Sequence, residues 1–244
     1  MTDRIATEKQ TARVTNPLQC WECRAALADA QENGIHFCSQ CGKVQPLATK
    51  SDYFSFFGLT RKLGVDAAQL EKQFHQLSWK LHPDKFNNAG AYERDLSLER
   101  TAALNDAYRT LRDPAARTEY LLRLEEVRKE GKVKQQAPPD LLEEVFELNE
   151  HLEELRAAKR SGSDPRALDE QRHQLEKARG TFQHKLDQVL AELTNQFAAW
   201  DALLDTRPGD AAAKRTVLAR MNEVLNRHSY IRNLVTNVSD ELEQ

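Results

Sequence analysis

The segment His82-Pro83-Asp84 stands between two amphipathic stretches, and this arrangement constrains the fold more than any other feature of the chain. Before it, apolar residues recur at the spacing of one helical face: Leu70, Phe74, Leu77 and Leu81. After it, residues 93–112 carry a second apolar stripe: Leu96, Ala103, Leu104, Ala107 and Leu111. Proline cannot continue the first helix, and it disfavours the helical conformation of the residue before it. The sequence therefore predicts two antiparallel helices with the side chains of His82 and Asp84 exposed at the corner between them.

The cysteines form two C-x2-C pairs, Cys20/Cys23 and Cys38/Cys41, with fourteen residues between the pairs. Such a pair turns both sulfurs toward one metal ion, and two pairs supply a tetrahedral set of four thiolates. We expect a structural zinc ion, with iron in a rubredoxin-type site as the alternative because it uses a similar ligand set. Two disulfides are less favoured, because no secretion signal accompanies the pairs. Residues 17–48 hold too little apolar material to fold unaided, so metal binding is expected to supply the folding free energy of this module.

The composition argues against several other classes of protein. Charged residues make up 30% of the 244 residues and aromatic residues 7%, a balance that favours helices over a β-sandwich or barrel. The formal net charge of -3 and the absence of a basic run give no electrostatic basis for binding nucleic acid. No apolar stretch approaches the roughly 20 residues of a membrane span. Residues 1–14 lack the apolar core of a signal peptide, so we expect a disordered tail at residues 1–16 of a cytoplasmic protein, or of a mitochondrial matrix protein if the source is eukaryotic.

A change of composition at residues 127–139 predicts a linker, since a glycine and two prolines, which break helices, occur there among alternating lysines. Beyond it, residues 140–244 carry the apolar stripes of three antiparallel helices, which predict a bundle. The first of these helices has a heptad seam: Leu141, Val145, Leu148, Leu152 and Leu155. The predicted fold class is therefore all-α, with a zinc-ribbon-like knuckle module at residues 17–48, a helical hairpin and a C-terminal three-helix bundle.

Two apolar residues of the first bundle helix lie outside its heptad seam. Leu142 and Phe146 lie on another side of the helix, close to carboxylates that include Glu147 and Glu150. An apolar pair bordered by acidic side chains suits a partner-binding surface. The alternative is that both side chains pack on the third helix of the bundle.

Three further motifs accompany the helical hairpin and its His82-Pro83-Asp84 corner. They are the aromatic segment YFSFFGL at residues 53–59, the segment LNDAYRTLRDP at residues 104–114, and a short third helix at residues 115–124. Together they resemble a J-domain, the part of DnaJ-type co-chaperones that stimulates a DnaK-type ATPase, and we place its boundaries at residues 51–126. Trp79 falls near the apolar stripe of the first helix of the hairpin, and we expect it to be half-buried in the core.

The order of a J-domain, a short linker and a three-helix bundle resembles the HscB family, the dedicated co-chaperones of iron–sulfur cluster assembly. The segment from His82 to Phe86, HPDKF, is close to the form of the motif in bacterial members, and residues 141–150 resemble the start of the family's bundle. The paired cysteines look like the metal-binding extension of eukaryotic members. The resemblance is strong through residue 125 and weak in the last two helices.

The resemblance implies an adaptor that is not an enzyme. In this family the J-domain docks on an HscA-type or DnaK-type chaperone and triggers ATP hydrolysis through a conserved tripeptide. The positions that match the tripeptide, with basic side chains that would add electrostatic contacts, are His82, Pro83, Asp84, Lys85, Lys80 and Lys72.

The resemblance also implies that the bundle holds an IscU-type scaffold protein. The positions that match the family's scaffold-binding face are Leu142, Phe146, Glu147 and Glu150. Glu143 departs from the pattern, because bacterial members can carry an apolar residue there. An aromatic residue that the family's last helix contributes to the face has three competing matches, Arg227, His228 and Tyr230.

The main alternative is a J-domain co-chaperone for a different protein client, in which the zinc module and the helical tail serve client binding or self-association. A self-associating tail would expose a continuous apolar seam, whereas a scaffold-binding bundle would expose only a local patch. A zinc-ribbon protein that binds nucleic acid is less favoured, since acidic residues outnumber basic ones in the first bundle helix. We expect a monomer or weak dimer with no nucleic-acid or membrane partner.

Overall fold

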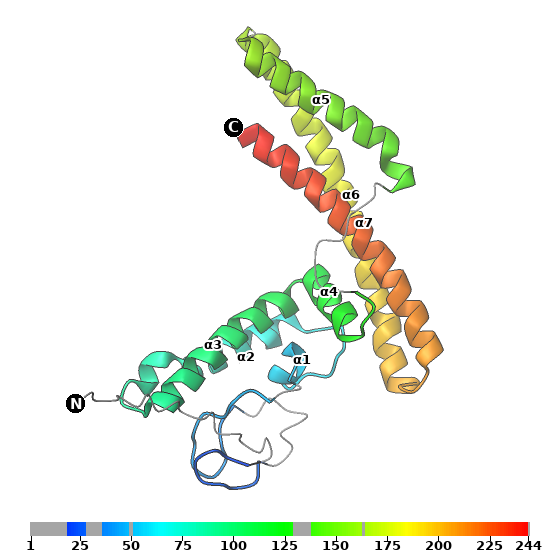
Figure 1. Ribbon diagram of the computed structural model, residues 1–244. Helices are drawn as coiled ribbons and strands as arrows, with labels where there is room; N and C mark the ends of the chain where they lie inside the picture. The colour runs from blue at the N-terminus through cyan, green and yellow to red at the C-terminus, as the bar shows by residue number, and fades with distance from the viewer. Residues whose placement is uncertain (1–18, 28–35, 49–50, 129–137, 163, 244) are drawn as a thin grey trace, which may run out of the picture. The chain divides into compact units, whose positions relative to one another are not determined.

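The computed structural model describes residues 19–27, 36–48, 51–128, 138–162 and 164–243 (Figure 1). The described chain is all-α, as the sequence predicts, and its extended segments form only isolated bridges, between Gln19 and Ala26 and between Phe37 and Val44. The tail expected at residues 1–16 and most of the expected linker, residues 129–137, lie outside the described residues. Among the described residues, no helix has the length and the apolar composition that a membrane span requires.

The chain divides into two units, residues 1–61 with 66–109 and residues 62–65 with 110–244. The first unit contains α1 (Tyr53–Phe56), α2 (Ala67–Leu81), the 3-10 helix η1 (Pro83–Phe86) and most of α3 (Ala91–Arg112). The second contains α4 (Pro114–Leu124), the 3-10 helix η2 (Pro139–Leu141), α5 (Leu142–Ser161), α6 (Pro165–Thr206) and α7 (Ala211–Glu243). The segment that resembles a J-domain therefore contributes helices to both units.

Local sequence sets the ends of the short helices. Asp52, Asp66 and Asp113 each accept hydrogen bonds from backbone N–H groups in the first turn of α1, α2 and α4 respectively. Pro114 occupies the first position of α4, where its missing N–H has no helical partner to lose. Pro83 is the first residue of η1 and prevents α2 from continuing beyond His82. The corner between α2 and α3 therefore lies at the position that the sequence predicts.

Helices α2 and α3 pack side by side around a shared apolar core. The hydroxyls of Ser97 and Thr101 on α3 donate to the carbonyl of Leu81, at the end of α2, over 2.7 and 3.1 Å. At the other end of the hairpin Phe74 stacks on Tyr108, with ring centroids 4.1 Å apart. The later residue of α3 therefore contacts the earlier residue of α2, so the two helices are antiparallel, as predicted. The buried core residues of the hairpin are Leu70, Leu81, Leu96, Leu104 and Ala107.

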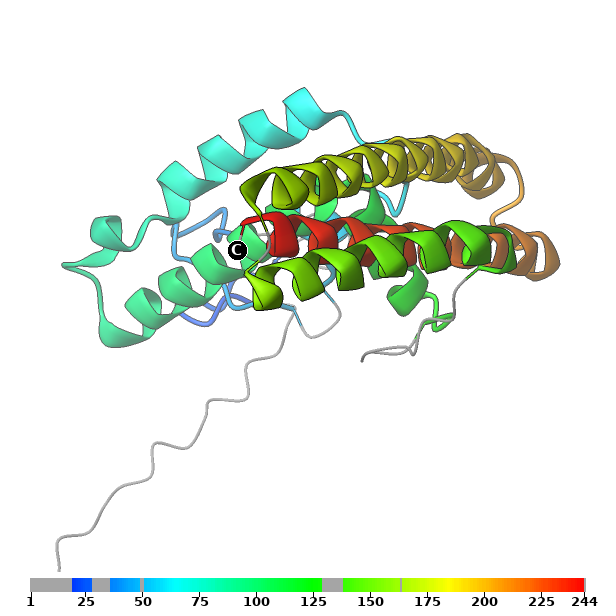
Figure 2. The same ribbon diagram turned by 90° about the horizontal axis from the view of Figure 1, so that it is seen from above.

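Helices α5, α6 and α7 form the predicted three-helix bundle, and they run side by side in both views (Figure 1, Figure 2). The whole predicted seam of α5 is buried: Leu141, Val145, Leu148, Leu152 and Leu155. Near the far end of α5, Arg156 donates to Glu241 of α7 at 2.8 Å. Near its start, Asp140 accepts from Arg227 of α7 at 2.5 Å. The two ion pairs fasten α5 to α7 at both ends, and the side of α5 opposite the seam remains available to solvent.

The rest of the second unit also packs on these long helices. Helix α4 contacts α6 and α7, and the buried guanidinium of Arg117 lies 5.4 Å from the ring centroid of Phe197 on α6. In the loop at residues 62–65, the N–H groups of Leu63 and Gly64 donate to the carboxylate of Asp201 at 2.7 and 2.8 Å. A Cβ atom at Gly64 would lie 2.7 Å from Asp201 Oδ2, so a glycine is what permits this close approach.

Candidate metal centre and partner-binding surfaces

The four cysteines lie on two turns that are built alike. In each turn the N–H of the first cysteine, Cys20 or Cys38, donates to the carbonyl five residues later. The N–H four residues later, of Arg24 or Gly42, donates back to the carbonyl of that cysteine. The chain reverses through a positive φ of 63° at Arg24 and 72° at Gly42, a conformation that glycine adopts freely and arginine adopts at a cost. Each turn thereby brings its two sulfur atoms to the same side.

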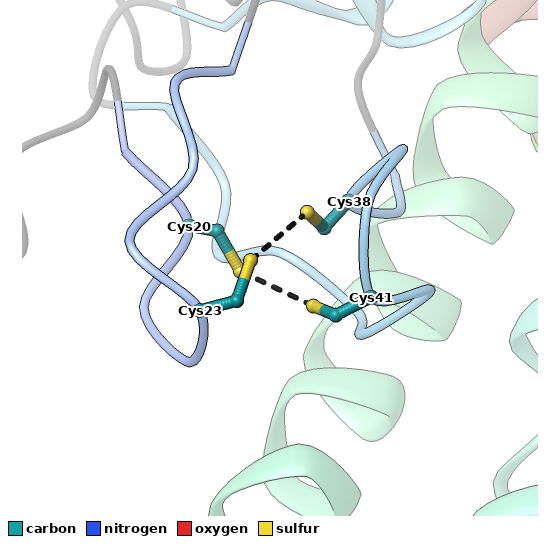
Figure 3. A group of neighbouring side chains, drawn as sticks. All are labelled: Cys20, Cys23, Cys38 and Cys41. Atoms are coloured by element: carbon teal, nitrogen blue, oxygen red, sulfur yellow. Dashed lines mark hydrogen bonds between the residues drawn. The ribbon is translucent and has the colours of Figure 1, made fainter.

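The four sulfur atoms are close enough to bind one metal ion (Figure 3). All lie within 4.8 Å of one another, with 3.6 Å between Cys20 and Cys41 and 3.7 Å between Cys23 and Cys38. In a tetrahedral site with Zn–S bonds of about 2.3 Å, the sulfurs are about 3.8 Å apart. The two measured pairs have this spacing, and each joins one turn to the other. The donor set therefore fits a closed four-thiolate site, for which zinc and iron are the candidate metals.

Hydrogen bonds within the first turn favour the ionised form of Cys20. Burial raises the pKa of its thiol, but the backbone N–H groups of Cys23 and Glu22, together with the thiols of Cys41 and Cys23, outweigh burial and lower this pKa to about 6. At Cys41 the backbone N–H of Lys43 lowers the pKa, but burial and the neighbouring sulfurs outweigh it and raise the pKa to about 12. Four thiolates at this spacing repel one another, so a bound cation is what allows all four to ionise together.

Helix α3 holds the second cysteine turn through a buried arginine. Arg100 is 3% exposed, and it donates to the carbonyls of Gln45 and Pro46 at 2.7 and 2.9 Å. Its Nη1 lies 3.1 Å from Nδ1 of His36, which must accept because a guanidinium only donates. The His36 proton is therefore on Nε2, which donates to the carbonyl of Phe56 at 3.0 Å. Burial and the charge of Arg100 lower the pKa of His36 to about 4, so this ring is neutral at pH 7.

A buried glutamate holds the same turn from the start of α3. Glu93 accepts from Nζ of Lys43 at 2.6 Å and from the backbone N–H of Val44 at 3.3 Å. Beside it, the ring of Trp21 meets Tyr92 edge-on, with centroids 4.8 Å apart, so the first turn also contacts α3. The knuckle module is thus a packed part of the first unit, held on α3 by charged anchors.

Sequence reasoning missed Glu93 and Arg100, although the sequence contains a signal for them. Both lie on the face of α3 that also carries the buried Leu96, Leu104 and Ala107, and such a face is normally apolar. A charged side chain at a core position needs a partner of opposite charge or a set of hydrogen bonds. The partners come from the knuckle module, a separate segment of the chain, so the pattern indicates a buried contact without identifying the residues that make it.

The structure places His82 and Asp84 at the exposed corner, as predicted. The side chain of His82 is 54% exposed and that of Asp84 is 80% exposed. Nδ1 of His82 accepts from the backbone N–H of Asp84 at 3.3 Å, so the neutral ring carries its proton on Nε2. A histidine held in this way offers one N–H donor to a partner, next to the exposed carboxylate of Asp84, whose Oδ2 lies 3.6 Å from His82 Nδ1.

The three lysines singled out near this corner are available for contact with an acidic partner. Lys72, Lys80 and Lys85 form no ion pair with any residue that the structure describes. Lys72 and Lys80 are exposed on α2, and Lys85 belongs to η1. Lys80 and Lys85 therefore lie beside the corner, whereas Lys72 lies about 15 Å farther back along α2.

Trp79 is 70% exposed, so the expectation that it is half-buried in the core is wrong. At 100° per residue it lies about 200° from both Leu77 and Leu81, on the side of α2 opposite the core. Nζ of Lys85 lies over its ring in a cation–π contact, and the water lost there lowers the pKa of Lys85. The ring thus adds a large apolar surface beside the corner.

The four residues proposed for the scaffold-binding face all lie exposed on α5. Phe146 is 72% exposed and Leu142 is 43% exposed, and Glu147 and Glu150 are exposed beside them. Leu142 and Phe146 are four residues apart and so share one face of the helix. Their exposure excludes the alternative in which both pack on the third helix of the bundle.

The three candidates on α7 for the last aromatic position have different surroundings. His228 is buried, and burial lowers its pKa, so its ring cannot contribute to an exposed face. Arg227 pairs with Asp140 of η2, two residues before Leu142, where α5 begins. Tyr230 is half-buried, and burial raises its pKa. Arg227 and Tyr230 therefore remain as candidates.

Comparison with known proteins agrees with this architecture. Residues 52–120 match the family model of the DnaJ domain. The iron–sulfur cluster co-chaperone protein HscB of Mus musculus is 35% identical over 137 residues, and the match spans 55% of this chain and 57% of that protein. This chain therefore matches little more than half the length of that relative.

Two other relatives are matched over more of their length. The HscB co-chaperone homolog of Cupriavidus taiwanensis is 34% identical over 167 residues, which is 67% of this chain and 82% of that protein. The crystal structure of human co-chaperone protein HscB is similar in fold, with a TM-score of 0.67 and 24% sequence identity. That likeness covers 91% of this chain and 96% of the human chain.

Proposed function

Since the chain belongs to the HscB family of J-domain co-chaperones, we propose that it joins an iron–sulfur scaffold protein to a chaperone ATPase. It stimulates ATP hydrolysis by a chaperone of the DnaK or HscA type, and it delivers a scaffold of the IscU type to that chaperone during cluster assembly. The protein acts by binding two partners, in the cytoplasm or in the mitochondrial matrix of a eukaryote.

One observation carries the assignment of the bundle. Among the described residues of α5, α6 and α7, Leu142 and Phe146 are the large hydrophobic residues that are exposed. Glu147 and Glu150 border them, which gives the arrangement of many protein interfaces, an apolar centre with a polar rim. A self-associating tail would expose a continuous apolar seam, whereas this patch is local. The patch therefore favours a partner with an apolar anchor and basic groups around it.

We assign chaperone docking to the exposed corner and the cations near it. The residues are His82, Pro83, Asp84, Lys85, Lys80 and Lys72. Cations that have no ion pair within the protein steer an acidic partner surface and raise the rate of association. For hydrolysis to accelerate, contacts at the corner must favour the hydrolytic conformation of the chaperone over its resting conformation, because equal affinity for both would shift nothing.

The two sites act together through effective concentration. A chain that holds the scaffold with its bundle and the chaperone with its J-domain makes their encounter intramolecular. The presence of the scaffold on the chaperone should then add to the stimulation caused by the J-domain alone.

We assign Cys20, Cys23, Cys38 and Cys41 to a structural metal ion, zinc in the first place and iron as the alternative. When bound, the ion neutralises the thiolates and crosslinks the two turns. Four protein ligands leave no position for a substrate, so the site serves folding and packing.

The double substitution Leu142→Ala with Phe146→Ala tests the scaffold assignment. Truncation of an interface anchor costs about 2 kcal/mol or more, so we expect the affinity for a purified IscU-type scaffold to fall at least roughly thirtyfold in titration calorimetry. The thermal midpoint should change little, because both side chains are exposed.

Leu98→Ala is the matched control, since Leu98 is an exposed leucine on α3, and it should leave scaffold affinity unchanged. Unaltered scaffold affinity in the double variant would contradict the assignment. Loss of helicity in the double variant would contradict the exposed placement of the two residues.

A further inference from the structure

Gln45 contacts both the candidate metal centre and α3. It is 2% exposed, and its Nε2 donates to Sγ of Cys20 at 3.4 Å and to the carbonyl of Lys43 at 2.8 Å. Its backbone carbonyl accepts the 2.7 Å hydrogen bond from Nε of Arg100. One residue therefore contacts a candidate metal ligand through its side chain and a J-domain helix through its backbone.

The hydrogen bond from Gln45 to Cys20 comes from a side chain outside the turn that contains Cys20, unlike the hydrogen bonds made within each turn. The N–H of Gln40 donates to Sγ of Cys38 at 3.4 Å, and it is a backbone group of the same turn. Gln45 follows the second turn, whereas Cys20 belongs to the first, 25 residues earlier. The amide of Gln45 therefore reaches Cys20 only when the two turns are held in their packed arrangement.

Two charged residues of α3 hold that arrangement. Arg100 bonds the carbonyl of Gln45, and Glu93 bonds the N–H of Val44, the residue directly before it. Helix α3 thus fixes the backbone at Val44 and at Gln45, from which the side chain of Gln45 reaches Cys20. Each of these contacts is buried, so water does not compete for it.

We propose that Gln45 is a positioning residue of the metal centre and that Arg100 and Glu93 fix its place, so that the affinity of the four cysteines for their metal depends on α3. The inference rests on the metal site proposed above. A hydrogen bond from an amide fixes the orientation of a ligating sulfur and withdraws charge from it, and loss of such an outer partner typically lowers metal affinity by roughly 10–100-fold.

The dependence acts in both directions. If packing on α3 raises metal affinity by some factor, metal binding must stabilise that packing by the same factor, because both belong to one thermodynamic cycle. If the second turn moved away from α3, Arg100 and Glu93 would lose their hydrogen bonds to it. Both side chains are buried, and a buried charged group without a partner costs free energy. Metal occupancy is thereby linked to the stability of a J-domain helix.

The 244-residue chain with Gln45→Met tests the proposal directly, because methionine keeps the length of the side chain and lacks the amide donor. We expect Zn²⁺ affinity, measured by competition with a chromogenic chelator, to fall about tenfold. Gln40→Met is the matched control, because it changes an exposed side chain of the module and keeps the backbone N–H that donates to Cys38, so it should bind Zn²⁺ like the wild type.

Arg100→Met should weaken Zn²⁺ binding by a similar factor, although it removes a residue outside the cysteine turns. Its matched control is Arg94→Met, the same change at an exposed position of α3. If Arg100→Met fails to fold, Gln45→Met still decides the question.

The Co²⁺-loaded protein gives a second measurement, which loss of packing alone would not alter. Removal of a hydrogen bond to a ligating thiolate makes its electrons easier to transfer, so the sulfur-to-cobalt charge-transfer band of Gln45→Met should move to lower energy. The Gln40→Met band should stay in place.

Equal Zn²⁺ affinity in Gln45→Met and Gln40→Met would overturn the inference. A loss of affinity with an unmoved Co²⁺ band would also contradict it, because Gln45 would then act through packing and not on the sulfur. A wild-type chain that takes up neither Zn²⁺ nor Co²⁺ would refute the metal site itself, and the inference with it, while the chaperone and scaffold roles keep their own tests.

Discussion

A His82→Gln chain is expected to lose its stimulation of ATP hydrolysis by a DnaK-type chaperone while its fold and its affinity for the scaffold are unchanged. The exposed ring of His82 makes a local hydrogen bond to the N–H of Asp84, so the substitution should change stability by no more than about 0.5 kcal/mol. Loss of a central interface anchor costs about 2 kcal/mol or more, so stimulation at subsaturating co-chaperone should fall at least roughly thirtyfold. Steady-state ATP hydrolysis over a range of co-chaperone concentrations measures this loss.

His75→Gln is the matched control for this experiment. His75 is an exposed histidine on α2, 3.9 Å from Glu71, and the same chemical change there should leave stimulation within about twofold of the wild type. Full stimulation by His82→Gln would show that the corner is not the docking site. Loss of scaffold affinity in the same variant would contradict the separation of the two sites.

Cys38→Ser is expected to abolish tight metal binding and to loosen the first unit. A structural zinc ion contributes roughly 10–16 kcal/mol through four ligands. Loss of one thiolate therefore removes about 3 kcal/mol, which is more than about a hundredfold in affinity. Because Arg100 and Glu93 of α3 bond the same turn as Cys38, amides of α3 should exchange hydrogen faster in the variant. Zinc content after dialysis and hydrogen exchange measure the two effects.

The bundle provides the internal reference for that experiment. Helices α5, α6 and α7 have their own buried core, so the exchange rates of their amides should match those of the wild type. Ser39→Ala, at the exposed neighbouring position, should keep both the metal and the exchange pattern. Unchanged exchange in α3 after metal loss would contradict the linkage between the metal site and this helix.

The helices could be predicted from the sequence because their signals are local. The seam from Leu141 to Leu155 repeats at helical spacing, and all of it is buried in the bundle. Pro83, Asp66 and Asp113 end or begin helices through interactions with their immediate neighbours. The cluster of four cysteines could be predicted equally well, since each C-x2-C pair brings two sulfurs together within one turn.

The exposed apolar pair on α5 could be predicted because Leu142 and Phe146 break the pattern of their own helix. Trp79 misled the same kind of reasoning. It lies between two positions of the α2 stripe, Leu77 and Leu81, but two residues along a helix correspond to about 200°, which turns the ring away from the core. Proximity in sequence to a stripe is therefore a poor guide to burial.

The contacts that join distant segments could not be predicted. Arg100 meets Gln45 across 55 residues, and Asp201 meets Leu63 and Gly64 across more than 130. Each contact depends on backbone groups, which every residue possesses, so no pairing of side-chain types identifies it. Charged residues on an apolar stripe, such as Glu93 and Arg100, indicate that a buried partner exists without identifying it.

The adaptor role is tested most directly by steady-state ATP hydrolysis by a DnaK-type chaperone in the presence of this protein, with and without an IscU-type scaffold. We expect each addition to stimulate weakly by itself and the two together to stimulate by more than the sum, because one chain holds both partners. The excess should disappear with Leu142→Ala and Phe146→Ala. Stimulation that is the same with and without the scaffold would contradict the account, and would leave a J-domain protein whose bundle serves another client.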